Sequence, residues 1–347
     1  MSFVPTFGFT NETDMQALLK ILSGSLAQGV TCSHRHHQRA SALNLSSLKL
    51  VGSLSPHIGN LTFLQVINLN NNSFHGVIPQ EVGRLFRIRY LILGNNSFEG
   101  EFPINVTHYS DLRVINLINN NLGEKVPTQL GSLPKLYELV LSLNHFFGTI
   151  PPTLGNISAL CFFNMSNNNL EGQTPIELGK LSNLEELQLS ENKLTSMIPP
   201  AILNISSINI LALVSNQLHG SLPSNLGLTF PKLERIYMGE NQFSGTIPAS
   251  LINASHLGVI DLGSNALTGG IPQNLGELKQ LELLNFGANT LGTAKSNDLQ
   301  FLTSLTNCSN LSVLRLHANQ LGGVLPTLIA NLSTKLIRLR LDQNCIS

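Results

Sequence analysis

The residue types that carry out catalysis are present in this sequence, but they do not form the common catalytic or nucleotide-binding motifs. No two glycines lie two positions apart, so the chain has no G-x-G-x-x-G nucleotide-binding loop. No His is followed by Glu, which excludes the H-E-x-x-H zinc motif, and no Ser lies between glycines two residues away on each side, which excludes the nucleophile elbow. We therefore predict that the chain is not an enzyme, and we expect no cofactor and no metal.

The densest group of candidate metal ligands is a histidine cluster near the N-terminus. It contains His34, His36 and His37, with Cys32 beside it. A metal site would need a fourth converging ligand and a rigid frame, whereas a loop of mixed His and Arg residues has no fixed geometry. We predict a solvated segment at this place.

Two arginines near the C-terminus have a spacing suited to holding a carboxylate. Arg338 and Arg340 flank Leu339, which we expect to be buried, so both guanidinium groups should project on the same side of one strand. Two such groups can grip a carboxylate through charge-assisted hydrogen bonds. The alternative is that they are solvated and pair with nearby groups such as Asp342.

A repeat of 24 residues must position these side chains. Leu48 fills its first slot, and asparagines fill the others: Asn72, Asn96, Asn120, Asn144, Asn168, Asn192, Asn216, Asn241, Asn265, Asn289, Asn319 and Asn344. A period of this length is typical of a solenoid, whose units are stable only when stacked on their neighbours. We predict about 13 repeats over residues 39–347, the last one incomplete, after an abbreviated N-terminal cap at residues 1–38 with a helix over 12–22.

Inside each repeat, the apolar residues predict one short strand. Leu181, Leu184, Leu187, Leu189 and Asn192 show the pattern L-x-x-L-x-x-L-x-L-x-x-N, which resembles that of leucine-rich repeats. Its central part alternates with a period of two, so one face is buried and the other points outward. The Asn amide can pair with backbone groups that the turn leaves unsatisfied. We expect an α/β solenoid with an asparagine ladder, a parallel sheet on the concave face and short helical turns on the convex face.

The outward strand positions offer a concave surface for an extended peptide. Early repeats present aromatic and apolar side chains there, middle repeats acidic ones and the last repeats basic ones. The candidate ligand-binding residues are Tyr90, Ile92, Tyr137, Val140, Phe162, Glu185, Glu186, Tyr237, Arg315, His317, Arg338 and Arg340. Scattered exposed aromatics are common, but their alignment on one face favours a binding surface.

Composition and charge exclude several other classes. Charged residues make up 12% of the chain and the formal net charge is zero, so there is no basic stripe for nucleic acid. No window of 18 apolar residues exists, so we expect no direct insertion into a membrane. The segment from Met1 to Thr10 lacks a basic residue and is a poor signal peptide. The four cysteines include no closely spaced pair, which predicts free thiols.

Asn-x-Ser/Thr sequons are frequent, and five of them recur at the same outer position of different repeats. Asn44 and Asn164 should instead lie in strands of the concave face, where a glycan would block binding. The predicted glycosylation sites are Asn60, Asn156, Asn204, Asn253 and Asn331. Any single sequon could also result from the repeat consensus alone and carry no glycan.

Eight repeats carry a second signature after the Asn. It is clearest in the segments from Asn72 to Pro79, Asn144 to Pro151 and Asn241 to Pro248. This N-x-L-x-G-x-I-P spelling resembles the plant-specific class of leucine-rich repeats. Its Gly permits a turn with positive φ and its Pro fixes φ, so a second short strand should end there.

Three further segments resemble plant leucine-rich-repeat receptor-like kinases. The segment from Asn11 to Leu19 resembles the start of their N-terminal cap, and Gly29 to Cys32 its end, but the usual block with Cys and Trp is missing. The segment from Asn297 to Leu311 resembles an insertion of the subfamily that includes receptors for bacterial elongation-factor and flagellin peptides. The chain ends before any transmembrane helix or kinase, as a receptor fragment would.

The resemblance implies a ligand-recognition ectodomain in immune or developmental signalling, located outside the cell or at the plasma membrane. It would bind a peptide or protein on its concave or lateral face, and full-length relatives recruit a co-receptor kinase. Arg338 and Arg340 resemble an Arg-x-Arg pair with which some plant receptors hold a peptide's carboxyl terminus. The alternatives are a secreted inhibitor of a cell-wall hydrolase, similar to polygalacturonase-inhibiting proteins, and a truncated receptor fragment without function.

One step of the repeat is longer than the rest. Asn289 and Asn319 are 30 residues apart. We predict that residues 293–303 form a convex insertion with a helical turn around 298–302, and that the strands near Leu284 and Leu314 remain paired.

Overall fold

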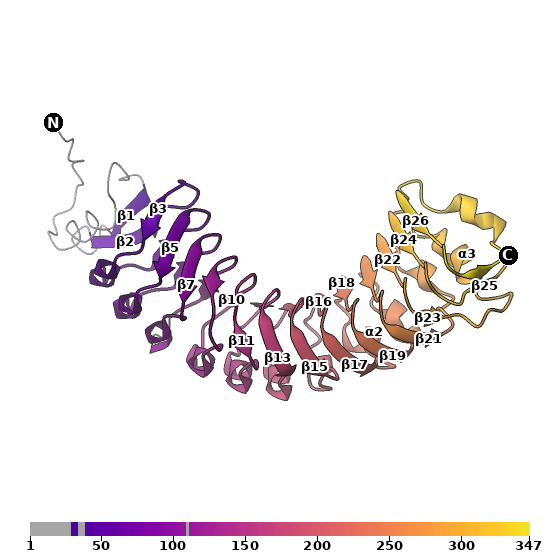
Figure 1. Cartoon of the computed structure of the whole chain (residues 1–347), viewed down its shortest axis with the longest axis horizontal. Helices are drawn as coiled ribbons and strands as arrows, with labels where there is room; N and C mark the ends of the chain where they lie inside the picture. The colour runs from indigo at the N-terminus through magenta and orange to yellow at the C-terminus, as the bar shows by residue number, and fades with distance from the viewer. Residues whose placement is uncertain (1–28, 34–38, 109–110) are drawn as a thin grey trace. The chain divides into compact units, whose positions relative to one another are not determined.

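The computed structural model describes residues 29–33, 39–108 and 111–347. The chain divides into two compact units, residues 1–170 and 171–347. Figure 1 labels strands and helices of both units. The predicted cap helix over residues 12–22 and the histidine cluster at His34, His36 and His37 lie outside the described residues.

One short strand per repeat builds a parallel sheet in each unit, as predicted. In the first unit the parallel strands are β2 (Arg39–Asn44), β4 (Val66–Asn68), β6 (Tyr90–Ile92), β8 (Val114–Asn116), β10 (Glu138–Val140) and β12 (Phe162–Asn164). In the second they are β14 (Glu186–Gln188), β16 (Ile210–Ala212), β18 (Arg235–Tyr237), β20 (Val259–Asp261), β22 (Leu283–Asn285), β24 (Val313–Arg315) and β26 (Arg338–Arg340). Equivalent residues of successive repeats are paired, so the 24-residue period fixes the register.

The described part of the cap region contributes a strand of opposite direction. β1 (Val30–Ser33) pairs with β2 in the antiparallel sense, with Val30 opposite Leu43. The sequence predicted only the end of a cap here, so this edge strand is an addition to the expected parallel sheet.

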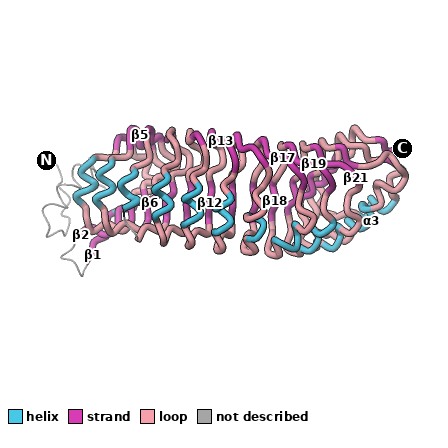
Figure 2. Tube along the Cα trace, turned by 90° about the horizontal axis from the view of Figure 1, so that it is seen from below, coloured by secondary structure: helices cyan, strands magenta, loops and turns pink. Residues whose placement is uncertain are grey.

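Short helical turns lie on the side of each unit opposite the strands (Figure 2). In the first unit they are the 3-10 helices η2 (Pro56–Asn60), η3 (Gln80–Arg84), η4 (Ile104–His108), η5 (Thr128–Ser132) and η6 (Pro152–Asn156). In the second they are η7 (Ile176–Lys180), η8 (Ile202–Asn204), α2 (Leu226–Thr229), η9 (Ala249–Asn253), η10 (Leu275–Glu277), α3 (Phe301–Leu305) and η11 (Thr327–Asn331). The leucines between strand and turn fill the core, where Leu187 and Leu189 are at most 1% exposed.

A second short strand follows the ladder position in most repeats. The first unit contains β3 (Val51–Ser53), β5 (Ser73–Val77), β7 (Ser97–Gly100), β9 (Asn121–Leu122) and β11 (Phe147–Gly148), and β13 (Asn169–Gln173) contains the division between the units. The second contains β15 (Lys193–Ser196), β17 (Gln217–Ser221), β19 (Gln242–Thr246), β21 (Ala266–Gly269), β23 (Thr290–Leu291), β25 (Gly322–Gly323) and β27 (Cys345–Ile346). Gly76, Gly148 and Gly245 have φ of 75°, 76° and 78°, which confirms the predicted turn.

The asparagine ladder has the predicted geometry. Asn120 is 6% exposed, and its Oδ1 accepts a hydrogen bond from the Phe98 amide of the preceding repeat at 2.9 Å. Its Nδ2 donates to the carbonyls of Leu93 and Leu117, each at 3.1 Å, and of Ile118 at 3.3 Å. One side chain therefore satisfies backbone groups of two repeats.

The long step between Asn289 and Asn319 leaves the sheet intact, as predicted. Leu284 pairs with Leu314 in register. The helix of the insertion, α3, begins at Phe301 and so lies about three residues later than expected. The preceding residues instead form a turn around Asp298.

Asp298 anchors this turn to the repeats. It is 8% exposed, and its Oδ2 accepts from the amides of Thr293 at 2.8 Å, Lys295 at 3.2 Å and Gly322 at 3.1 Å. Burial raises the pKa of this carboxyl, but the hydrogen bonds from Thr293, Gly322 and Lys295 outweigh burial, and its pKa lies below the ordinary value.

We expect Asn120→Ala to lower the free energy of unfolding by about 3 kcal/mol, because it leaves buried backbone groups of two repeats without partners. Asn121→Ala is the matched control, since the Asn121 side chain is exposed. Urea unfolding followed by circular dichroism measures both. Equal stability of the two variants would contradict the role of the ladder.

We expect Asp298→Asn to lower the free energy of unfolding by about 2 kcal/mol at pH 7, because three amides lose a charged acceptor. The folded-state pKa is depressed, so this contribution is present above the ordinary pKa near 4 and is lost as pH falls through the folded value. The difference between the two proteins should shrink in urea titrations at pH 3. A constant difference at both pH values would show that the charge is not responsible.

Candidate ligand-binding surface

The outward side chains of the parallel strands form what we call the sheet face. In β6, Tyr90 and Ile92 are half-buried, and Leu91 between them is fully buried. The same alternation recurs in β8, β10 and β12, whereas all three residues of the last strand β26 are exposed. The predicted binding residues therefore lie on or beside this face within their own unit.

Four neighbouring repeats of the first unit line a pocket on the sheet face. It has a volume of about 450 Å³ and is lined by Tyr90, Arg113, Val114, Pro134, Lys135, Tyr137 and Ala159. Phe162 packs edge-on against Tyr137, with ring centroids 5.1 Å apart and planes at 74°. We call it the Tyr90–Tyr137 pocket. It brings together two of the four predicted aromatic residues, Tyr90 and Tyr137, and a third, Phe162, packs against Tyr137.

The rim of this pocket is basic. Lys135 Nζ lies 2.6 Å from Asp111 Oδ1. The hydrogen bond from Lys135 lowers the pKa of Asp111 most, followed by the Lys135 charge, and the charges of Arg89 and Arg113 act in the same direction. Because all of these groups are solvent-exposed, their effect on stability is small. Of the two basic side chains that line the pocket, Lys135 is paired with Asp111, so the net positive charge of the rim comes from Arg113.

Two predicted residues of the first unit lie on the sheet face but do not line the pocket. Ile92 pairs across the sheet with Asn68 and Asn116, and Val140 lies between Asn116 and Asn164. These positions form a row of mostly asparagine residues. Asn164 and Asn44 end their strands on this face, as predicted for these two sequons.

The acidic residues of the second unit lie beside and on β14. Glu185 precedes the strand and Glu186 begins it, and Glu186 Oε2 accepts a hydrogen bond from Gln188 Nε2 at 2.7 Å. Tyr237 ends β18 and is half-buried beside Asp261 of β20. Glu185, Glu186 and Tyr237 therefore lie on the same face, with the two glutamates at β14 and the tyrosine on β18.

Asp261 is a polar feature of this face that the sequence did not single out. Burial raises its pKa, although the amide of Gly263 at 3.1 Å and Asn285 Nδ2 at 2.8 Å donate to Oδ1. Equivalent strand-end asparagines, such as Asn68 and Asn116, accept from the amide two residues later in the same way. The sequence offers one signal for this site: Asp261 occupies the strand-end position at which other repeats carry asparagine.

The basic residues of the last repeats are adjacent, but one of them already holds a carboxylate. Arg315 and Arg340 are paired in register on β24 and β26. Arg340 binds Asp342 through Nη2–Oδ2 at 2.8 Å and Nε–Oδ1 at 3.1 Å. This is the alternative that the sequence left open for the arginine pair.

The prediction that Leu339 is buried is wrong. It is 42% exposed in β26, the last strand in the order of this sheet. His317, by contrast, leans over Gly287 of the preceding repeat, where an added Cβ would lie 2.4 Å from its Nδ1. That nitrogen is buried without a hydrogen-bond partner among the described residues.

A larger pocket in the first unit lies outside the sheet face. It has a volume of about 740 Å³ between second strands and helical turns, and Leu54, Val77, Ile78 and Pro79 are among its lining residues. The sequence carries no signal for this pocket. Val77 occupies a variable position of the turn, and its 60% exposure depends on how the neighbouring repeats pack.

Two features are absent from the described residues. No set of three His, Cys, Asp or Glu residues there is arranged to hold a metal ion. No helix in that part of the chain has the length and apolar character needed to cross a membrane. Cys308 and Cys345 are unpaired as predicted, and burial raises the pKa of the Cys308 thiol.

The five predicted glycosylation sites occupy one structural position. Each is the last residue of a 3-10 helix: Asn60 in η2, Asn156 in η6, Asn204 in η8, Asn253 in η9 and Asn331 in η11. Asn60 is half-buried and the other four are exposed. A glycan at this position would extend from the side opposite the sheet face.

The family is shown by direct comparison. A model described as a leucine-rich repeat region matches residues 45–286, and a leucine-rich repeat model matches residues 310–332. The chain belongs to the leucine-rich-repeat family.

The predicted similarity to plant receptor kinases is also confirmed. A probable leucine-rich-repeat receptor-like serine/threonine-protein kinase of Arabidopsis thaliana is 53% identical over 62 residues, which is 18% of this chain and 6% of that protein. The crystal structure of PEPR1–AtPEP1 matches with a TM-score of 0.80 and 27% identity over 97% of this chain and 52% of that one. The Arabidopsis receptor kinase HAESA, solved with the peptide hormone IDA and the co-receptor SERK1, matches with a TM-score of 0.70 and 30% identity over 88% of this chain and 58% of that one.

We expect N-glycans at the five helix-end sites when the chain is expressed with a secretion signal in plant cells, because four of these asparagines are exposed and the fifth is half-buried. Peptide mass spectrometry after enzymatic deglycosylation measures occupancy. Asn44 and Asn164 should be unmodified, since they end strands of the sheet face, where a glycan would block ligand binding. High occupancy of Asn44 and Asn164 would contradict a glycan-free sheet face.

Proposed function

We propose that this chain is the ligand-recognition part of a plant receptor-like kinase and that it binds an extended peptide on its sheet face. The Tyr90–Tyr137 pocket is the observation that carries the proposal. It combines exposed aromatic surface with a cationic rim, on the face where the strands present side chains in regular rows. Large, rigid tyrosine side chains are frequent anchors of binding energy in interfaces.

The structural neighbours support this proposal at the level of class. HAESA was solved with the peptide hormone IDA and the co-receptor SERK1, and PEPR1 was solved with AtPEP1. We propose, by extension, that a peptide bound to this chain recruits a co-receptor kinase in signalling at the plasma membrane. The chain spans about half the length of these solved structures. The activity of a whole receptor is therefore part of what we propose for it.

The basic end of the second unit would have a different role. A peptide carboxylate reaching Arg338 and Arg340 has to compete with Asp342, which already bonds Arg340 at 2.8 and 3.1 Å. We propose that Arg338 and Arg315 make the first contact, and that Arg340 contributes when the ligand displaces Asp342. The acidic residues Glu185 and Glu186 would face basic parts of the same ligand.

The test uses a peptide selected from a random display library on the parent chain. We expect Tyr90→Ala combined with Tyr137→Ala to weaken its binding at least about 30-fold, since hot-spot aromatics contribute about 2 kcal/mol or more. Isothermal titration calorimetry measures the affinity. Val77→Ala is the matched control, because Val77 is 60% exposed and lines the other pocket of the same unit.

Two outcomes would contradict the proposal. One is a selected peptide that binds the double tyrosine variant as tightly as the parent. The other is a larger loss with Val77→Ala, which would place the ligand between the second strands and the helical turns. Circular dichroism of each variant verifies that the repeats remain folded.

A further inference from the structure

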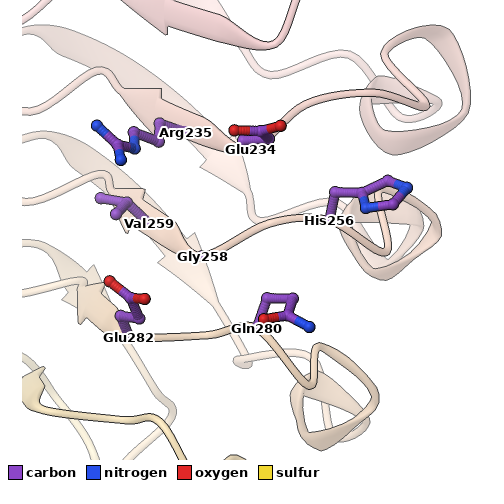
Figure 3. A pocket seen from close by; sticks show the side chains of 7 residues that line it. All are labelled: Glu234, Arg235, His256, Gly258, Val259, Gln280 and Glu282. Carbon is purple, nitrogen blue, oxygen red and sulfur yellow. The ribbon is translucent and has the colours of Figure 1, made fainter.

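One position of the second unit interrupts a row of long side chains. The residues that directly precede the parallel strands β14 to β24 are Glu185, Asn209, Glu234, Gly258, Glu282 and Ser312. Only Gly258 among them has no side chain. A pocket of about 280 Å³ lies over it (Figure 3), lined by Glu234, Arg235, His256, Gly258, Val259, Gln280 and Glu282.

The backbone floor of this pocket is fully engaged within the sheet. The Gly258 amide donates to the Glu234 carbonyl at 2.9 Å, and the Gly258 carbonyl accepts from the amides of Glu282 at 2.7 Å and Leu283 at 3.1 Å. A ligand therefore has to bind through the side chains that surround the pocket.

The backbone does not require glycine at this position. Gly258 is absent from the residues with positive φ, and the nearest heavy atom to an added Cβ is the Gln280 carbonyl oxygen at 3.1 Å. The neighbouring repeats carry Glu234 and Glu282 at the same place. The pocket is thus a gap of one side chain in an otherwise regular surface.

The walls of the gap are two carboxylates without partners. Glu234 and Glu282 lie one strand away on each side, which separates their backbones by roughly 9.6 Å. Neither carboxylate forms an ion pair or side-chain hydrogen bond within the described residues, and both are exposed. A cation entering the gap would find two acceptors that the protein itself leaves unused.

The other lining groups define the direction of entry. Figure 3 shows Arg235 and Val259 projecting from neighbouring strands, with His256 and Gln280 on the far side of Gly258, toward the helical turns. Val259 and the Gly258 backbone offer apolar surface for a methylene chain. Arg235 is the one cation among the lining residues that is charged at every physiological pH, so it restricts an incoming cation to the space nearer Glu234 and Glu282.

We propose that the pocket over Gly258 is a subsite for one basic side chain, arginine or lysine, of the ligand peptide. The peptide context rests on the proposed function, but the chemistry of the subsite does not. A chain of three or four methylenes would pack on Gly258 and Val259 while its charged end reaches Glu234 or Glu282. Filling the gap with a neutral side chain, or neutralising both carboxylates, removes the preference for positive charge.

The test uses Nα-acetyl-arginine amide as the probe and Nα-acetyl-citrulline amide as its neutral counterpart. The amide signal of Gly258, in protein labelled with ¹⁵N-glycine and assigned from the spectrum of Gly258→Ala, reports binding at the pocket floor. We expect a saturable shift with the arginine probe and about five-fold weaker binding of the citrulline probe, the upper end of what one exposed ion pair contributes. Glu234→Gln combined with Glu282→Gln should reduce arginine binding to the citrulline level.

Two controls make the result specific. Glu277→Gln removes an exposed carboxylate from the helical-turn side of the same unit and should leave the shift unchanged. Gly258→Gln fills the gap and should abolish the charge preference. Because this variant lacks the Gly258 reporter, binding is followed by the labelled amides of Gly239 and Gly263. Equal binding of both probes, no shift at Gly258, or an unchanged preference in the double glutamine variant would overturn the subsite.

This outcome is separable from that of the proposed function. A charge-selective shift at Gly258 together with tyrosine variants that bind peptide normally would support the subsite and contradict the placement of the peptide. The reverse combination would leave peptide recognition supported and remove the subsite.

Discussion

The structure depends on one interaction, the hydrogen bonding of a buried asparagine amide to backbone groups of two successive repeats. Asn144 accepts from the Leu122 amide and donates to the carbonyls of Leu117, Leu141 and Ser142. The chain turns sharply before each ladder asparagine, and the preceding residue, for example Leu143, has a φ of 57°. That conformation is unfavourable for a leucine, and the ladder bonds offset its cost. Backbone groups at a buried turn need partners, and this side chain supplies them in the repeats that carry the asparagine.

Because the ladder fixes the turn, it also fixes the sheet face. Each strand begins and ends at the same place in its repeat, so outward residues fall into rows whose members are about 4.8 Å apart. A substitution in a row changes the surface without changing the fold. Tyr90 and Tyr137 create a pocket in this way, and so does Gly258, which opens one by lacking a side chain. Recognition and stability are thereby carried by different residues of the same strand.

The sequence predicted the repeat, the register and the outward positions, since all three follow from spacing. It placed Leu284 opposite Leu314 across an irregular step, and the structure pairs them. It did not predict that α3 begins at Phe301, because the hydrogen bonds of Asp298 reach Gly322 of the next repeat. Spacing could not decide the partner of Arg340, because that depends on side-chain rotamers. Nor could it reveal the pockets, because these depend on the sizes of side chains in several neighbouring repeats.

The central claim is that the sheet face binds a peptide, and a crystal structure of the chain with a library-selected peptide tests it most directly. The account predicts an extended peptide lying across β6, β8 and β10, with one side chain in the Tyr90–Tyr137 pocket. A peptide bound instead to the helical turns or in the pocket beside Val77 would contradict it.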